Sequence, residues 1–333
     1  MNIAVFSQIP DSASTYYRAL FPFKQIAFDL TRFHYDLIGG DTLKLTTADL
    51  FKYDLCFMMR PHDPSHITLL QALKNMHIPI WIDFDDDLFS IPYNHKEYEY
   101  FALDSTHHAI LQGVALADVV TVTTDELKDS FVSRGADKDK IEVIPNAVND
   151  YLFPEPAQHN LQKKETIGWR GGFTHDRDLV TIEGTVRELT DKNFRFIFMG
   201  HRPYAIEKSL RKGAFSRLPE QDIFSYFQSL KEIALPFFVV PLEDTPLNRS
   251  KSNIAFQEAT WLSGSLVFSP DWFKDGGISY KSESQLIRKI TELSGEIASV
   301  RQAYFDQQVA LIRSKYLLSN VNDLRLAILD RFI

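Results

Sequence analysis

The chain has 333 residues, of which 44% are hydrophobic and 13% aromatic, and it carries a net charge of −8 with a single cysteine. This composition supplies packed cores and excludes a disordered chain, and the length suits two domains of about 150 residues each. No apolar run approaches the roughly 18 residues that a membrane span needs, and the first residues lack the pattern of a signal peptide. We therefore expect a cytoplasmic protein without a transmembrane segment, in which the lone Cys56 is a buried packing residue.

The charge is unevenly divided along the chain. Residues 1–155 hold 12 Lys and Arg against 23 Asp and Glu, a net charge of −11, whereas residues 156–333 carry +3. An acidic first half is a poor surface for a polyanion, and a mildly basic second half suits a phosphorylated small molecule. The asymmetry predicts two domains with different ligands.

The first half alternates short β-rich runs with amphipathic stretches. Helices are expected at 15–30, 66–76 and 123–135, and strands at 2–7, 33–39, 53–59, 78–84, 119–124 and 141–148. Such alternation predicts a parallel sheet covered by helices on both faces. Two prolines and a polar run at 149–165 are typical of a linker.

The second half repeats the pattern. Helices are expected at 178–190 and 252–264 and over the last 45 or so residues, and strands at 166–171, 194–200, 235–242 and 265–270. The predicted fold class is α/β, with two Rossmann-like, doubly wound parallel-sheet domains in tandem. In such sheets ligands bind beyond the carboxyl ends of the strands, so two facing rims would form a ligand cleft between the domains.

Several nucleotide and metal motifs are absent from the sequence. No G-x-G-x-x-G follows the first strand and no P-loop motif occurs, which disfavours a dinucleotide oxidoreductase and a P-loop enzyme. No EF-hand loop and no zinc-like spacing of His and Cys is present either.

Four aspartates stand in the stretch WIDFDDDLFSIP, residues 81–92, directly behind the apolar run HIPIWI. Asp83, Asp85, Asp86 and Asp87 could hold a divalent metal, supply an acid or base, or cap the loop that ends the strand. Asp87 fits the capping role best.

A candidate anion site precedes the predicted helix at 252–264. Asn248, Arg249, Ser250, Lys251 and Ser252 place two cationic side chains beside the free N–H groups and positive dipole end of that helix, which suits a diphosphate. Glu258 follows Lys251 by about two helical turns, so its carboxylate could accept hydrogen bonds from a ribose diol. The alternative is an ordinary helix N-terminus followed by a surface glutamate.

With TIGWRGGFTHDRDL, FRFIFMG and IEVIPNAVN in the same order, this segment resembles the nucleotide-sugar glycosyltransferases of the GT-B fold, especially the large retaining family 4. The resemblance implies an acceptor-binding domain at 1–155, a donor-binding domain at 156–315 and a helix at 316–333 that packs back toward the first domain. It also implies a UDP- or GDP-sugar co-substrate and no metal or other cofactor, because the helix dipole and cationic side chains neutralise the diphosphate.

The resemblance assigns residues one by one. Behind the first donor-domain strand, where the family usually has an Arg and a Lys, this chain has Arg170, Gly171, Gly172, His175 and Arg177. Of the family's two glutamates only the second remains, Glu258, since Ser250 stands at the first; Lys251 becomes the better phosphate ligand. Arg18 is expected to reach the phosphates as well.

A D-x-D metal motif belongs to the single-domain GT-A fold, so Asp83, Asp85 and Asp86 are expected on the acceptor side, where one orients a hydroxyl or accepts its proton.

The predicted reaction moves a sugar from a nucleoside diphosphate to an acceptor hydroxyl with retention, the acceptor being a glycan or lipid-linked glycan. One alternative is a phage-type transferase acting on DNA bases, for which a basic cluster could track the phosphate backbone: Arg202, Lys208, Arg211, Lys212 and Arg217. The acidic first half opposes it, and a solvated helix would explain the cluster as well. Two further alternatives are a non-catalytic nucleotide-sugar-binding protein and a two-domain sugar-nucleotide epimerase.

Overall fold

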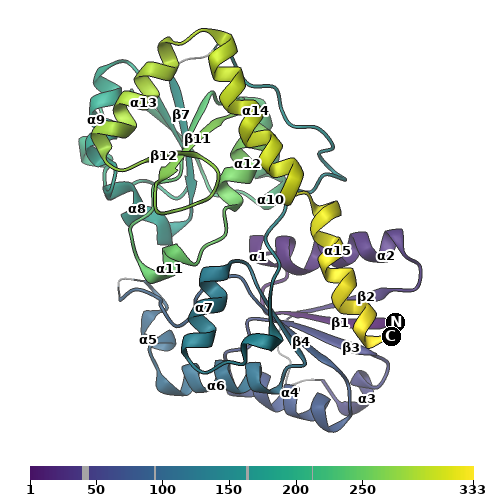
Figure 1. Cartoon of the computed structure of the whole chain (residues 1–333). Helices are drawn as coiled ribbons and strands as arrows, with labels where there is room; N and C mark the ends of the chain where they lie inside the picture. The colour runs from purple at the N-terminus through teal and green to yellow at the C-terminus, as the bar shows by residue number, and fades with distance from the viewer. Residues whose placement is uncertain (40–44, 94, 163–164, 212) are drawn as a thin grey trace. The chain divides into compact units, whose positions relative to one another are not determined.

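The structure is a computed structural model that describes residues 1–39, 45–93, 95–162, 165–211 and 213–333. The chain forms two compact units, whose elements are labelled in Figure 1. Unit 1 comprises Met1–Ala147, Arg249–Ser252 and Leu318–Ile333, and unit 2 comprises Val148–Asn248 and Asn253–Leu317.

Unit 1 contains a six-stranded sheet in the order β2-β1-β3-β4-β5-β6, with every pair of neighbours parallel. Its strands are β1 (Asn2–Ser7), β2 (His34–Gly39), β3 (Leu55–Met59), β4 (Ile80–Phe84), β5 (Val119–Val122) and β6 (Ile141–Val143). Asp83 on β4 lies in register with Met59 on β3 and Thr121 on β5. The carboxyl ends of the three central strands therefore meet at one edge of the sheet.

Helices cover both faces of this sheet (Figure 1). They are α1 (Ala13–Thr15), the π-helix η1 (Tyr16–Leu20), α2 (Phe21–Asp29), α3 (Thr47–Leu50), α4 (Pro64–Asn75), α5 (Tyr98–Phe101), α6 (Asp104–Leu116), α7 (Asp125–Ser133), η3 (Lys138–Lys140), α15 (Leu318–Leu329) and η6 (Asp330–Phe332).

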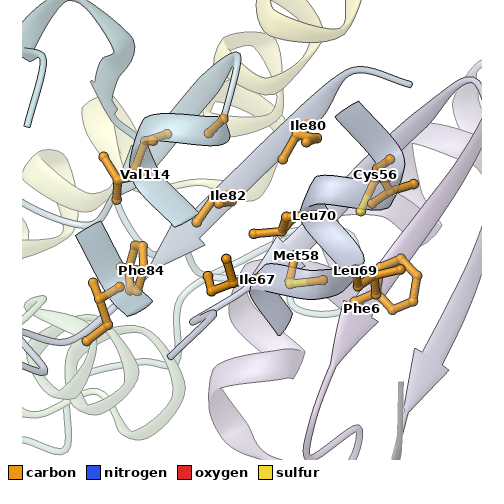
Figure 2. Packing of buried hydrophobic residues seen from close by; sticks show 14 of the residues in the cluster. Phe6, Cys56, Met58, Ile67, Leu69, Leu70, Ile80, Ile82, Phe84 and Val114 are labelled. Carbon is orange, nitrogen blue, oxygen red and sulfur yellow. The ribbon is translucent and has the colours of Figure 1, made fainter. Parts of the chain in front are cut away.

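Strict alternation along β4 divides the core of unit 1 into two layers. Ile80, Ile82 and Phe84 join a cluster with α4, α6 and α7 that Figure 2 shows, whereas Trp81 joins the cluster on the other face. That second cluster also contains Phe23 of α2 and residues of α15. A central parallel strand buried on both faces needs apolar side chains at successive positions, which explains the unbroken run at 78–82.

Unit 2 has a second all-parallel sheet of six strands, in the order β12-β11-β10-β7-β8-β9. The strands are β7 (Thr166–Gly171), β8 (Arg195–Gly200), β9 (Phe215–Leu218), β10 (Phe237–Val239), β11 (Leu266–Pro270) and β12 (Ile278–Tyr280). The other elements are η4 (Phe173–His175), α8 (Asp176–Val180), α9 (Glu183–Asp191), η5 (Glu207–Ser209), α10 (Ile223–Ile233), α11 (Pro246–Arg249), α12 (Ile254–Ser263), α13 (Glu283–Gly295) and α14 (Ala298–Lys315).

The predicted fold class, two α/β parallel-sheet domains of Rossmann type, is confirmed, but two local predictions were wrong. The helix expected at 178–190 is divided into α8 and α9. The Thr181 hydroxyl donates to the Asp178 carbonyl at 2.6 Å where α8 ends, and three β-branched residues at 180–182 add a slight preference against helix. The stretch of the basic cluster is not one helix either, since Arg217 lies on strand β9. Lys212 of that cluster lies outside the described residues.

Over the described part of the chain, no helix combines the length and the apolar character that crossing a membrane requires.

Candidate functional site

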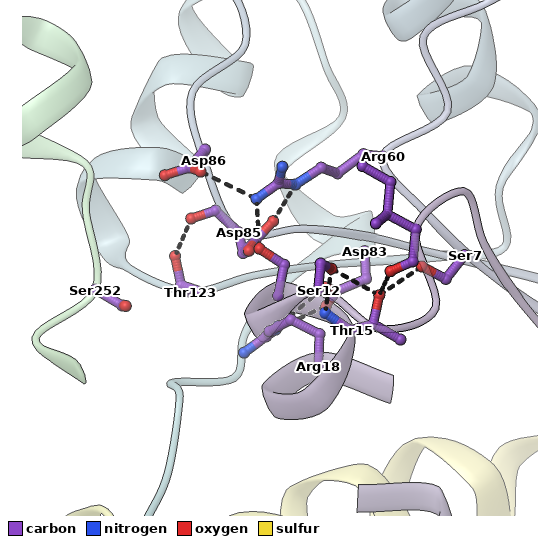
Figure 3. Close-up of polar contacts among 12 residues, drawn as sticks. Ser7, Ser12, Thr15, Arg18, Arg60, Asp83, Asp85, Asp86, Thr123 and Ser252 are labelled. Atoms are coloured by element: carbon purple, nitrogen blue, oxygen red, sulfur yellow. Dashed lines mark hydrogen bonds and ion pairs between the residues drawn. The ribbon is translucent and has the colours of Figure 1, made fainter. Parts of the chain in front are cut away.

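Polar side chains gather at and beyond the carboxyl ends of β3, β4 and β5 in unit 1 (Figure 3). The four aspartates of residues 83–87 all lie there, yet each has different partners and a different exposure. Those partners decide which carboxylate is available for chemistry.

Asp83 is buried in a bidentate ion pair. The Nε and Nη2 atoms of Arg18 donate to its two oxygens at 2.9 and 2.7 Å. The side chains of Arg18 and Asp83 are only 1% and 2% exposed. The Thr121 hydroxyl donates to Asp83 Oδ1 at 2.5 Å and in turn accepts a hydrogen bond from the Trp81 indole at 2.9 Å. Asp83 thus belongs to a closed polar network inside the fold.

Arg18 reaches that network because it lies on the π-helix η1, a rare element that often occurs at functional sites. Its Nη1 donates to the Ile144 carbonyl at 2.6 Å and to Asn146 Oδ1 at 3.1 Å. The phosphate contact expected of Arg18 stays a prediction, and it would require Arg18 to leave the buried pair with Asp83.

Arg60, at the end of β3, holds the next two aspartates. Its guanidinium donates to Asp85 through Nε and to Asp86 Oδ2 through Nη2 at 3.0 Å, and the same Nη2 donates to Ser14 Oγ at 2.9 Å (Figure 3). Burial alone would lower the pKa of Arg60, but the carboxylates of Asp85 and Asp86 outweigh it and raise the pKa, so the side chain stays charged. Its backbone has φ of +47°, which a residue with a long side chain adopts at a cost of about 1–3 kcal/mol.

Asp86 is the accessible member of the cluster. Its side chain is 31% exposed, compared with 8% for Asp85 and 2% for Asp83. Oδ2 faces Arg60, and Oδ1 lies 3.7 Å from the ammonium nitrogen of Lys251. Among the three predicted acceptor-side carboxylates, Asp86 is therefore the one that a ligand can reach without unfolding the network.

Asp87 has the capping role that the sequence indicates. Its carboxylate accepts hydrogen bonds from the Phe89 backbone N–H at 3.1 Å, from Ser90 Oγ at 2.8 Å and from Ser130 Oγ at 2.7 Å. It ties the loop after β4 to helix α7.

The segment Arg249–Ser252 belongs to unit 1. Asn146 Nδ2 donates to Ser252 Oγ at 2.9 Å, and Thr124 Oγ1 donates to the Ser250 carbonyl at 2.8 Å. The following helix, α12, begins at Ile254 rather than at 252, and its N-cap Asn253 makes no side-chain capping bond. Arg18 and Asn146 thereby connect this segment to the buried pair of Asp83.

Glu258 lies in unit 2 and is only 3% exposed. Its Oε2 pairs with Arg170 Nη2 at 2.9 Å and accepts the Tyr226 hydroxyl at 3.0 Å. Burial, reinforced by the charge of Glu258, raises the pKa of Tyr226 far above its usual value, so the phenol stays a donor. The ribose contact of Glu258 stays a prediction; Tyr226 is a partner that nothing in the sequence pattern revealed.

The other candidates of unit 2 surround the end of β7. His175 Nδ1 lies 2.7 Å from Asp178 Oδ2, and Asn248 Nδ2 donates to Asp178 Oδ1 at 2.8 Å. Arg177 pairs with Glu243 at 2.9 Å on the surface. These contacts bring His175 and Asn248 together through one buried carboxylate.

Gly171 and Gly172 differ in the space around them. A Cβ at Gly171 would lie 2.6 Å from the Trp169 ring and 2.8 Å from the His175 Cβ, whereas a Cβ at Gly172 would meet nothing within 4 Å. Gly171 is therefore required by packing, and the backbone at Gly172 is open to a ligand.

Within the described ranges, no group of three or more His, Cys, Asp or Glu side chains is arranged to hold a metal ion.

No protein-family model matches the chain, and no curated protein matches it. Solved structures are similar over its whole length. An α-glucosyltransferase in complex with UDP-glucose and DNA containing an abasic site has a TM-score of 0.71 at 12% identity, covering 98% of this chain and 99% of that chain. Anabaena HepE in complex with UDP and glucose has a TM-score of 0.63 at 12% identity, covering 99% and 100%. The UDP-GlcNAc 2-epimerase of Neisseria meningitidis bound to UDP-GlcNAc has a TM-score of 0.58 at 13% identity, covering 99% and 100%.

The two parallel sheets and their strand orders place the chain among proteins built from two Rossmann-like domains. The likeness to these structures over the whole chain shows which fold of that class it is, namely GT-B. At identities of 12–13% the likeness shows the fold alone, and membership of family 4 remains a prediction.

Proposed function

We propose that the protein is a glycosyltransferase that moves a sugar from a nucleoside diphosphate to an acceptor hydroxyl. The observation that carries the proposal is the GT-B fold shared over 98–99% of the chain with proteins solved with UDP or UDP-glucose. A fold by itself does not determine a reaction, so the residues must supply the argument for chemistry.

On the donor side, the proposal assigns Lys251 to the departing diphosphate. The N-terminus of α12 and one of Arg170, Arg177 or Arg249 would add to the positive potential around it, since stabilising the developing charge is the main electrostatic task. No metal is required in this scheme, and activity that survives EDTA would support it. Retention of the anomeric configuration, by similarity to family 4, is part of the proposal.

On the acceptor side, the proposal gives the three aspartates different tasks. Asp86, 31% exposed, orients the acceptor hydroxyl or accepts its proton. Asp83 and Asp85 act as positioning residues, because Arg18 and Arg60 occupy their carboxylates. The acceptor is proposed to be a glycan or lipid-linked glycan, since the −11 charge of residues 1–155 suits a neutral polyol better than a polyanion.

The test is a panel of UDP-, GDP-, dTDP- and CMP-sugars, with nucleotide release measured with and without candidate glycan acceptors. Acceptor-dependent release is expected, and Asp86→Asn should lower it at least about a hundredfold, the lower end of what general acid–base catalysis contributes. The exposed Asp139 of η3, which precedes the amino end of β6 and so lies at the opposite edge of the sheet, provides a matched control in Asp139→Asn. Binding of a nucleotide without consumption of any donor would instead favour a non-catalytic binding protein.

Two other reactions are distinguished by the same assay. DNA as the acceptor is favoured by the likeness to the α-glucosyltransferase solved with DNA, and a salt-dependent shift of labelled duplex followed by sugar transfer would establish it. An epimerase, favoured by the likeness to the UDP-GlcNAc 2-epimerase, would convert the sugar nucleotide without any acceptor.

A further inference from the structure

The bridging position of Asp86 has a consequence for donor binding. Its two oxygens face different cations, with Arg60 at 3.0 Å and Lys251 at 3.7 Å. All three side chains are partly exposed, at 31% for Asp86, 29% for Arg60 and 19% for Lys251. A soluble anion can therefore reach the same two cations that the Asp86 carboxylate now neutralises.

We propose that Asp86 is an internal competitor for the donor diphosphate: its carboxylate pairs with Lys251 until the diphosphate displaces it. The inference rests on the proposed function, in which Lys251 holds the diphosphate, and it assigns Asp86 a role in donor affinity beyond that reaction. When the diphosphate binds, Lys251 leaves Asp86 and the carboxylate keeps Arg60 as its partner. Donor binding thereby takes Lys251 away from Asp86 Oδ1 before the acceptor hydroxyl approaches, so the donor is expected to bind before the acceptor.

Neighbouring contacts explain why Asp86, and not Asp83 or Asp85, has this role. Asp83 is buried against Arg18 and Thr121, and Asp85 is only 8% exposed and is paired with Arg60. The segment carrying Lys251 is held in place by the contacts of Ser250 and Ser252 to Thr124 and Asn146, so Lys251 can exchange partners without the backbone moving.

Asp86→Asn removes the competing charge and keeps the size of the side chain. An ion pair between partly exposed side chains at this distance contributes little interaction free energy. The variant is therefore expected to bind UDP or GDP only about two- to fivefold more tightly than the wild-type chain. The gain should shrink at 0.5 M NaCl, a condition under which exposed charges are screened. Asp139→Asn makes the same charge change at the opposite edge of the sheet and should leave the affinity unchanged.

Titration calorimetry with UDP and with GDP on the full chain measures these affinities. A second variant, Asp86→Ser, should reproduce the gain if Asp86→Asn fails to fold, and the gain should disappear in a Lys251→Gln background. Equal affinities of Asp86→Asn and Asp139→Asn, a loss of affinity, or a gain that persists without Lys251 would each overturn the competitor role while leaving the proposed transferase intact. If neither nucleotide binds the wild-type chain, the competitor role fails, and the transferase proposal is then decided by the remaining donors of the sugar-nucleotide panel.

Discussion

Breaking the buried pair of Arg18 and Asp83 should destabilise unit 1 strongly. Asp83→Asn leaves the guanidinium of Arg18, 1% exposed, without its counter-charge, and such a loss costs about 3–5 kcal/mol. With an m value of about 2 kcal/mol per M urea, the unfolding midpoint of unit 1 should fall by about 1.5–2.5 M urea. The assay is hydrogen exchange by mass spectrometry across a urea series, followed in peptides that cover β4 and β5.

Two companion variants distinguish the loss of the buried ion pair from the general effects of a substitution. Arg18→Met combined with Asp83→Asn should cost less than the sum of the single variants, because neither charge of this pair is then left without the other. Asp330→Asn breaks the exposed pair with Arg32, whose side chains are 53% and 54% exposed, and should cost no more than about 1 kcal/mol. If the unfolding midpoint of Asp83→Asn lay within about 0.3 M urea of the wild-type midpoint, the reasoning about the buried pair would be refuted. A shift of that size is roughly the smallest that such an experiment resolves.

Two further predictions concern unit 2. Burial raises the pKa of Asp275 from 3.8 to about 6, so between these values the folded state binds more protons than the unfolded state and stability falls as the pH rises. Thermal unfolding should show a loss of up to about 3 kcal/mol between pH 4 and pH 7, and Asp275→Asn should remove most of this pH dependence. Gly171→Ala should lower the melting temperature, because its Cβ would lie 2.6 Å from the Trp169 ring, whereas Gly172→Ala should change stability little and weaken UDP or GDP binding instead. An equal loss of stability in the two alanine variants would contradict the latter prediction.

The fold was largely predictable from local sequence. Apolar runs such as residues 78–82 identify strands that are buried on both faces, and their alternation with amphipathic stretches indicates a parallel sheet. The break between α8 and α9 was missed because three β-branched residues lower helix propensity only weakly, while the Thr181 hydroxyl bond that ends α8 depends on the folded backbone.

The candidate site was predictable in place but not in its assignments. Because Asp83, Asp85, Asp86 and Asp87 lie at and just after the end of a predicted strand, the sequence determined that carboxylates lie at the carboxyl edge of the first sheet. Only the tertiary structure decided that Asp83 is buried against Arg18, that Asp87 caps the loop to α7, and that Asp86 stays accessible between Arg60 and Lys251.

The sequence could not show these pairings because the partners of each ion pair lie far apart along the chain. Local spacing carries hydrophobic period and capping signals, but an ion pair forms between side chains that the fold brings together, 65 residues apart for Arg18 and Asp83 and 25 for Arg60 and Asp85. The sequence therefore determined which groups line the edge of the sheet, and tertiary packing determined which of them are neutralised inside the fold and which can meet a ligand.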